Sequence, residues 1–213
     1  MDDTPQERRA PRHFSMLRSF ALADLFTLGN VFCGTGALLA LVQHLATQEE
    51  GWLWLAFALH PVALVMDTLD GRVARWRHRS SLLGADLDSL ADVVSFGVSP
   101  AVLGFVLGMR GALDVAVLLY FVACGTSRLA RFNVTAAALA DDSGKVKYFE
   151  GAPIPTSVLL VGVLAWFTWK GRTGEHLPLG ALQVGGLTFH PSVLMYALLG
   201  STMISKTLRI PKI

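Results

Sequence analysis

Apolar residues dominate six segments of this chain, and polar residues gather in the connections between them. Trp52 to Met66 is a representative run of fifteen residues without a charge. A membrane helix needs about 20 residues, so this helix can span only if it continues through Asp67 and Asp70. The pattern predicts an all-α membrane protein with six transmembrane helices. Their expected ranges are 28–46, 52–76, 82–108, 112–131, 153–170 and 189–205.

The composition supports a membrane protein of several spans. Hydrophobic residues make up 53% of the chain, and the mean hydropathy is +0.50. Charged residues make up 16%, against about a quarter in soluble domains. The formal net charge of +2 argues against a nucleic-acid partner. Cys33 and Cys124 fall within apolar runs, so we expect small core residues rather than a disulfide.

The predicted helices are interrupted by residues that alter helix geometry. We expect Pro61 and Pro100 to kink or break their helices locally. Gly104 and Gly108 form a GxxxG pair, which predicts a close-packing face.

The N-terminal part mixes apolar and charged residues over positions 14–28. This mixture predicts an interfacial amphipathic helix, and an extension of the first span explains it nearly as well. We therefore expect three parts: a cytoplasmic segment with the interfacial helix (1–27), a six-helix domain (28–205) and a short cytoplasmic tail (206–213).

The distribution of Lys and Arg predicts the orientation. With both termini inside, fifteen of the 18 basic residues face the cytoplasm, and Arg110, Lys170 and Arg172 remain outside. Cytoplasmic loops of membrane proteins carry such an excess. We expect a multi-pass integral membrane protein whose termini are both cytoplasmic.

Four aspartates lie inside or beside the predicted second and third spans. Asp67 and Asp70 are three residues apart and Asp88 and Asp92 four apart, so each pair shares one helical face. An ionised carboxylate in a bilayer costs at least about 2.5 kcal/mol and usually has a function. Oxygen ligands suit hard divalent cations. The alternatives are a solvated loop, or an ion-coupled transporter, for which repeated halves would be expected.

Small residues and one arginine accompany the aspartates. Gly71 and Ala74 remove bulk from one helix and Gly84 from the facing helix, which lets a base or phosphate approach the backbone. Helix packing alone explains each of them singly. Arg75 can make bidentate contacts to a phosphate. Together with divalent ions, these residues indicate a diphosphate site.

The complete pattern, Asp67-x-x-Asp70-Gly71-x-x-Ala74-Arg75 followed after eight residues by Gly84-x-x-x-Asp88-x-x-x-Asp92, resembles the signature of the CDP-alcohol phosphotransferases. The resemblance implies six membrane helices, a homodimer, a cytoplasmic active site and release of CMP from a CDP-linked donor. It implies two divalent ions, Mg²⁺ or Mn²⁺, held by Asp67, Asp70, Asp88 and Asp92, and Asp92 as the general base. It also implies that Asp67, Gly71, Ala74, Arg75 and Gly84 bind CDP.

Further segments resemble the branch of this family that transfers a phosphatidyl group from CDP-diacylglycerol to L-serine. They are Thr27–Gly34, Asp88–Ala101, Ser127–Val134, Phe149–Pro155 and Met203–Lys212. Inositol phosphate, glycerol phosphate and choline remain alternative acceptors.

Arg128 and Arg131 stand at the inner end of the fourth span, with Asn133 following. A guanidinium pair there can hold the serine carboxylate or a donor phosphate. The alternative is that these arginines contact the headgroups of membrane lipids. We expect the polar segment 135–150 to be a loop over the mouth of the site.

Overall fold

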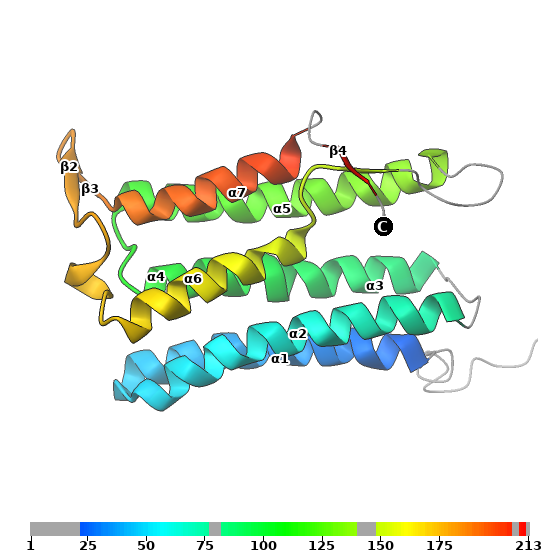
Figure 1. The fold of residues 1–213 in the computed structure, drawn as a ribbon, viewed down its shortest axis with the longest axis horizontal. Helices are drawn as coiled ribbons and strands as arrows, with labels where there is room; N and C mark the ends of the chain where they lie inside the picture. The colour runs from blue at the N-terminus through cyan, green and yellow to red at the C-terminus, as the bar shows by residue number, and fades with distance from the viewer. Residues whose placement is uncertain (1–21, 77–81, 140–147, 206–208, 212–213) are drawn as a thin grey trace, which may run out of the picture.

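The structure, a computed structural model, describes residues 22–76, 82–139, 148–205 and 209–211. It is mostly helical, and its helices run side by side along the long axis (Figure 1). The helices are α1 (Leu22–Thr47), α2 (Glu50–Trp76), α3 (Leu82–Asp92), α4 (Ser99–Val106), α5 (Ala112–Leu139), α6 (Ser157–Trp169) and α7 (Leu194–Ile204). The short helical turns are η2 (Val93–Val98), η3 (Ile154–Thr156), η4 (Gly174–His176) and η5 (Pro191–Val193).

Within the described residues, four helical stretches are long and apolar enough to cross a membrane: Asp24–Thr47, Glu50–Val73, Gly84–Val106 and Ala112–Val134. Two shorter apolar stretches, Ile154–Trp169 and Pro191–Ile204, fall below that length. Large apolar side chains such as Phe32, Leu159 and Leu198 are exposed. A bilayer is the solvent in which such side chains on a helix surface are stable.

The third span is a helix with an irregular middle. α3 and α4 are joined without a break by η2, a π-helical turn, and Pro100 lies in the first turn of α4, where a missing N–H costs little. Helix α2 continues through Pro61, so of the expected kink or break, the break does not occur there. The buried His60 side chain of α2 shares a hydrogen bond of 3.1 Å with Ser99, which fastens α2 to the start of α4.

Helix α1 packs along α2, and α5 packs along α7, with the third span in contact with both α1 and α5. The core between them contains Phe96, Phe121 and Tyr196. The rings of Phe121 and Tyr196 meet edge to face at 5.3 Å between centroids. Tyr196 Oη donates a hydrogen bond of 2.6 Å to the Pro100 carbonyl, so the buried hydroxyl is satisfied.

Gly104 and Gly108, the predicted GxxxG pair, make two separate contacts and do not form one close-packing face. At Gly104, an added Cβ would lie 2.9 Å from Cζ of Tyr196, so glycine allows α7 to approach α4. Gly108 has φ +122° and lies against the backbone of Gly174. A side chain there would be strained as well as crowded.

Two small antiparallel sheets mark opposite ends of the bundle (Figure 1). At one end, β2 (Leu182–Val184) and β3 (Leu187–Phe189) form a hairpin whose turn residues Gly185 and Gly186 both have positive φ. At the other end, β1 (Tyr148–Glu150) pairs with β4 (Arg209–Pro211). The prediction of a loop over residues 135–150 is therefore wrong at both ends, since α5 continues to Leu139 and β1 begins at Tyr148.

The N-terminal prediction is tested only in its last part. Residues 22–28 belong to the same continuous helix as the first span, as the alternative interpretation expects. The remainder of the proposed interfacial helix lies outside the described residues, and the expected boundary between residues 27 and 28 falls inside α1. Cys33 and Cys124 are both free, as predicted.

Candidate active site

The acidic residues of the signature come together toward one end of the bundle, between the C-terminal part of α2 and the C-terminal half of α3. One ligand oxygen from each of Asp67, Asp70 and Asp88 lies within 4.8 Å of the others. This is the one such group of three or more potential metal-binding side chains that the described residues contain. The helical spacing of the aspartates predicted this convergence, because each pair occupies one face of its helix.

Asp70 and Asp92 are each only 6% exposed, and both are held by helix α1. Thr27 Oγ1 donates a hydrogen bond of 2.9 Å to Oδ2 of Asp70. Asn30 Nδ2 donates one of 3.1 Å to Oδ1 of Asp92. Buried carboxylates need such donors, because a buried charge without partners is costly. The sequence analysis did not assign Thr27 or Asn30 to the site.

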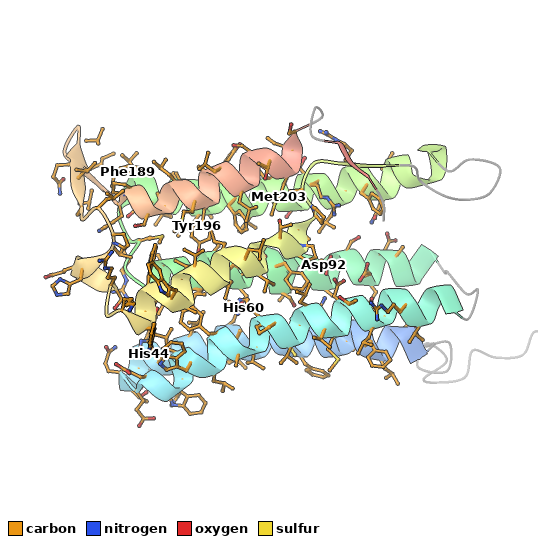
Figure 2. All side chains as sticks on the ribbon, in the orientation of Figure 1. His44, His60, Asp92, Phe189, Tyr196 and Met203 are labelled. Atoms are coloured by element: carbon orange, nitrogen blue, oxygen red, sulfur yellow. The ribbon has the colours of Figure 1, made fainter. Side chains whose placement is uncertain are left out.

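Asp92 differs from the other three carboxylates in its surroundings. Its carboxylate contacts that of Asp67, and one of its oxygens is also bound by Asn30. It lies toward the end of the bundle opposite His44 (Figure 2). Asp92 is also the last residue of α3, directly before the π-helical turn. π-helical turns occur frequently at functional sites.

The small residues of the signature lie around the cluster. Gly71 is on α2 and half-buried, and a Cβ added to it would meet nothing within 4 Å, so there is open space beside the helix. Gly84 lies in the first turns of α3, and Ala74 and Arg75 lie in the last turn of α2. The side chains of Ala74 and Arg75 fall outside the described part of the structure, so the phosphate contact of Arg75 stays a prediction.

Helix α5 brings a cation to the site. The guanidinium of Arg128 is half-buried and interacts electrostatically with the Asp92 carboxylate, and it also lies 5.5 Å from the centroid of the Phe132 ring. Asn133 exchanges hydrogen bonds of 2.9 and 3.2 Å with the Ser89 hydroxyl, next to Asp88. Arg131 is half-buried on the same helix. The structure thus places Arg128 beside the carboxylates, and Asn133 where it ties α5 to α3.

The donor set fits a divalent cation. All the converging groups are carboxylates, which Mg²⁺, Mn²⁺ and Ca²⁺ prefer. Oδ1 of Asp88 is buried and has no hydrogen-bond partner among the described residues. An orphaned carboxylate oxygen facing other carboxylates is stabilised when a cation is present. The acidic cluster is therefore a site that can bind a divalent metal.

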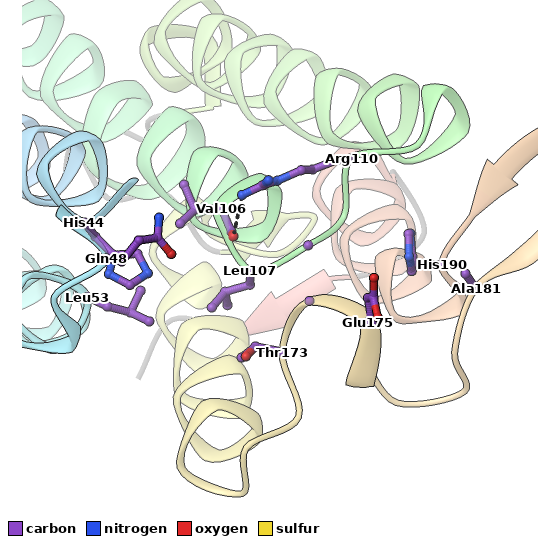
Figure 3. A pocket seen from close by; sticks show the side chains of 12 residues that line it. His44, Gln48, Leu53, Val106, Leu107, Arg110, Thr173, Glu175, Ala181 and His190 are labelled. Carbon is purple, nitrogen blue, oxygen red and sulfur yellow. Dashed lines mark hydrogen bonds between the residues drawn. The ribbon is translucent and has the colours of Figure 1, made fainter. Parts of the chain in front are cut away.

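A separate cavity of about 480 Å³ opens at the opposite end of the bundle (Figure 3). It lies between the α1–α2 turn, the end of α4 and the segment before β2, with His44, Arg110, Glu175 and His190 among its lining residues. The cavity contains none of the signature carboxylates. Nearby, Asp114 accepts hydrogen bonds from the backbone N–H groups of His190 and Gly111 at 2.8 and 2.9 Å. Its carboxylate also contacts the His190 ring at 2.5 Å.

The chain belongs to the CDP-alcohol phosphatidyltransferase family, since residues 20–203 match the model of that family. It is 45% identical over 203 residues to the CDP-diacylglycerol–serine O-phosphatidyltransferase of Saccharomyces cerevisiae, covering 94% of this chain and 74% of the yeast protein. It is 35% identical to the enzyme of the same name from Helicobacter pylori, covering 67% of this chain and 56% of that protein. The corresponding enzyme of Methanocaldococcus jannaschii is 35% identical over 70% of this chain and 62% of that protein.

These matches confirm the family expected from the signature. With four helices long and apolar enough to span, they also support a mostly helical integral membrane protein. The chain covers less than two thirds of the bacterial and archaeal relatives. Family membership excludes the ion-coupled transporter that the intramembrane carboxylates left open.

Proposed function

We propose that this protein transfers the phosphatidyl group of CDP-diacylglycerol to the hydroxyl of L-serine, forming phosphatidylserine and CMP. The observation that carries the proposal is the convergence of Asp67, Asp70 and Asp88 in a chain 45% identical to the yeast enzyme. A carboxylate cluster that binds divalent cations suits a diphosphate substrate, whose own charge would otherwise be repelled by the aspartates.

The donor has to be bound where its diphosphate meets the acidic cluster. We assign Asp67, Asp70 and Asp88 as ligands of two divalent ions, Mg²⁺ or Mn²⁺, with Asp92 as a further candidate ligand. Bound there, the ions supply charge neutralisation on the diphosphate and on the leaving CMP. Gly71, Ala74, Arg75 and Gly84 line the cytidine and phosphate positions together with Asp67. The open space beside Gly71 supports this assignment.

Asp92 is the general base of the proposed reaction. Its carboxylate takes the proton of the serine hydroxyl, and the serine oxygen forms a bond to the phosphorus that carries diacylglycerol. The bond from that phosphorus to the oxygen bridging the two phosphates breaks, and CMP departs with its electron pair. Its bond to Asn30 and its electrostatic interaction with Arg128 support a role distinct from the other carboxylates.

The serine substrate carries a carboxylate, which needs a cationic partner in a partly buried site. Arg128 is the best-supported candidate, because it interacts electrostatically with Asp92. We propose that Arg128, with Arg131 and Asn133 on the same helix, binds serine or a donor phosphate. The bond of Asn133 to Ser89 supports a position next to Asp88.

We propose that η3–α6 and η5–α7 complete a set of six transmembrane helices over residues 28–205. Their lengths, 154–169 and 191–204, are short for spans, but both helices pack within the bundle. Both termini and the active site face the cytoplasm in this proposal, because fifteen of the 18 basic residues then lie inside. A homodimer and an N-terminal interfacial helix over residues 1–27, with a cytoplasmic tail at 206–213, complete the proposed organisation.

The direct test is release of CMP from CDP-diacylglycerol by the purified protein in detergent or vesicles. Serine, inositol phosphate, glycerol phosphate and choline should be compared at equal concentrations with Mn²⁺ and with Mg²⁺. We expect turnover with serine and phosphatidylserine as the lipid product. Turnover with another alcohol but none with serine would refute the acceptor, and an absence of CMP release with every alcohol would refute the reaction.

A further inference from the structure

Asn30 occupies an unusual position for an amide side chain. It lies within the apolar helix α1 and is 0% exposed. Its Nδ2 donates to Oδ1 of Asp92, a residue 62 positions away, at 3.1 Å. Its own Oδ1 is buried and has no hydrogen-bond partner among the described residues. Burying an amide with an unsatisfied oxygen is costly, so packing alone does not account for an asparagine at this position.

The orientation of this amide follows from the groups that it faces. An ionised carboxylate can only accept hydrogen bonds, and the amide offers donors on Nδ2 and an acceptor on Oδ1. With the amide turned over, two acceptor oxygens would face each other at a buried position. The contact with Asp92 therefore selects the orientation in which Nδ2 donates. Asn30 thus fixes the Oδ1 side of Asp92, while the same carboxylate also contacts Asp67.

The backbone carbonyl of Asn30 also accepts a hydrogen bond from the segment that follows Asp92. Ser95, three residues after Asp92 in the π-helical turn, donates a hydrogen bond of 2.9 Å from Oγ to the carbonyl of Asn30. This approach requires Gly34, because a Cβ there would lie 2.7 Å from Cα and 2.9 Å from Cβ of Ser95. Asn30 thus contacts α3 at its last residue and η2 in its middle. Both contacts fix the position of α1 relative to Asp92.

We propose that Asn30 is a positioning residue that holds the Asp92 carboxylate in the orientation in which it takes the proton of the acceptor hydroxyl. This inference rests on the proposed function. The neighbouring bond from Thr27 to Asp70 belongs to the metal-binding carboxylates. One face of α1 therefore supports two kinds of carboxylate through two different residues, and substitution of each residue should affect a different step.

The test compares Asn30→Leu, which keeps the approximate volume and removes the donor, with Asn30→Asp, which keeps the shape and presents an oxygen to Asp92. The matched control is Gln43→Leu, which removes an exposed amide at the far end of the same helix. For each protein, kcat and both KM values are measured at saturating Mn²⁺. Mn²⁺ binding is measured separately by electron paramagnetic resonance, and folding by thermal melting and gel filtration.

We expect kcat to fall about 10- to 100-fold in the Asn30 variants, because a small misplacement of a catalytic group has effects of this size. The KM for CDP-diacylglycerol should stay within about twofold of wild type, and the Mn²⁺ affinity should fall much less than kcat, because Asp67, Asp70 and Asp88 still converge without Asn30. Gln43→Leu should match wild type throughout. A merely structural role would lower the melting temperature and Mn²⁺ binding together with kcat.

The outcomes separate this inference from the proposed function. Wild-type protein that releases no CMP refutes the function itself. With an active wild type, a fall in kcat of less than about fivefold in a folded Asn30 variant overturns the positioning role. A parallel loss of Mn²⁺ binding reassigns Asn30 to the metal site and also overturns it. Failure of both variants to fold would assign Asn30 to the stability of the fold instead.

Discussion

The hydrogen bond from Thr27 to Asp70 gives a quantitative test of the metal site. Replacing Thr27 by Val keeps the branched shape and removes the hydroxyl that donates to Oδ2 of Asp70 at 2.9 Å. Thr27 is 4% exposed and Asp70 6%, so water cannot readily replace the lost donor. The bond crosses from α1 to α2, and its loss frees the Asp70 carboxylate to rotate away from Asp67 and Asp88.

The size of the effect follows from the kind of bond. A hydrogen bond to a charged group contributes about 1.5–3 kcal/mol, and each 1.4 kcal/mol corresponds to roughly a factor of ten. Groups that orient metal ligands typically change metal affinity by about 10- to 100-fold. We therefore expect Thr27→Val to raise the Mn²⁺ concentration for half-maximal activity by roughly 10- to 100-fold. At saturating Mn²⁺, kcat should be nearly restored, because Asp92 keeps its bond to Asn30.

The assay is a titration of CMP release with Mn²⁺ at saturating CDP-diacylglycerol and serine, supported by direct Mn²⁺ binding. Thr68→Val is the matched control, because Thr68 is an exposed residue of α2 whose hydroxyl bonds the Leu64 carbonyl rather than a carboxylate. An unchanged Mn²⁺ requirement in Thr27→Val would refute the reasoning. So would a loss of kcat that saturating Mn²⁺ does not reverse.

Four further predictions follow from other parts of the molecule. Asp88→Ala should abolish CMP release and weaken Mn²⁺ binding in a protein that still folds; full turnover of wild type in excess chelator would contradict the metal assignment. Arg128→Lys, which keeps the charge and loses the planar fork, should raise the KM for serine far more than that for CDP-diacylglycerol; an unchanged serine KM would remove Arg128 from the acceptor site. A cysteine at Gln183 in the β2–β3 hairpin, in a protein without native cysteines, should react with an impermeant reagent on intact cells; protection there with labelling only after lysis would reverse the proposed topology. Asp114→Asn should destabilise the fold by about 1–3 kcal/mol, because buried donors lose an acceptor. The kcat at low temperature should stay unchanged. An unaltered melting temperature would show that this contact is dispensable.

Much of the site was predictable from local patterns. The i, i+3 and i, i+4 spacing of the aspartates predicts which helix faces they occupy, and the cost of burying charge predicts that those faces meet. The apolar runs likewise predict where the helices lie, to within a few residues. α5 is the main exception, because it extends to Leu139, well beyond the end expected from the apolar run. Ala136 to Ala138 are strong helix formers, so the helix outlasts the apolar pattern that predicts a membrane span.

The features that could not be predicted from the sequence are those that depend on contacts between distant residues. Thr27 and Asn30 are ordinary polar residues in an apolar helix until the fold places them 2.9 and 3.1 Å from carboxylates that are 43 and 62 positions away. The pairing of β1 with β4 joins two strands of three residues each, which are too short for a periodic signal. The π-helical turn has no distinct local pattern either, because its residues would suit an α-helix equally well.

The π-helical turn has a consequence for the exchange of segments between members of this family. Such a turn acts as one residue inserted into an α-helix, and one residue corresponds to about 100° of rotation around the helix axis. Deleting a single residue within Val93–Val98 would remove this insertion and keep the flanking helices in phase, whereas forcing the six residues into an α-helix of unchanged length would rotate α3 by about that angle relative to α4. Asp88 would then turn away from α2, although every signature residue is retained. A chimera of two family members should therefore be joined outside this turn, with its length preserved.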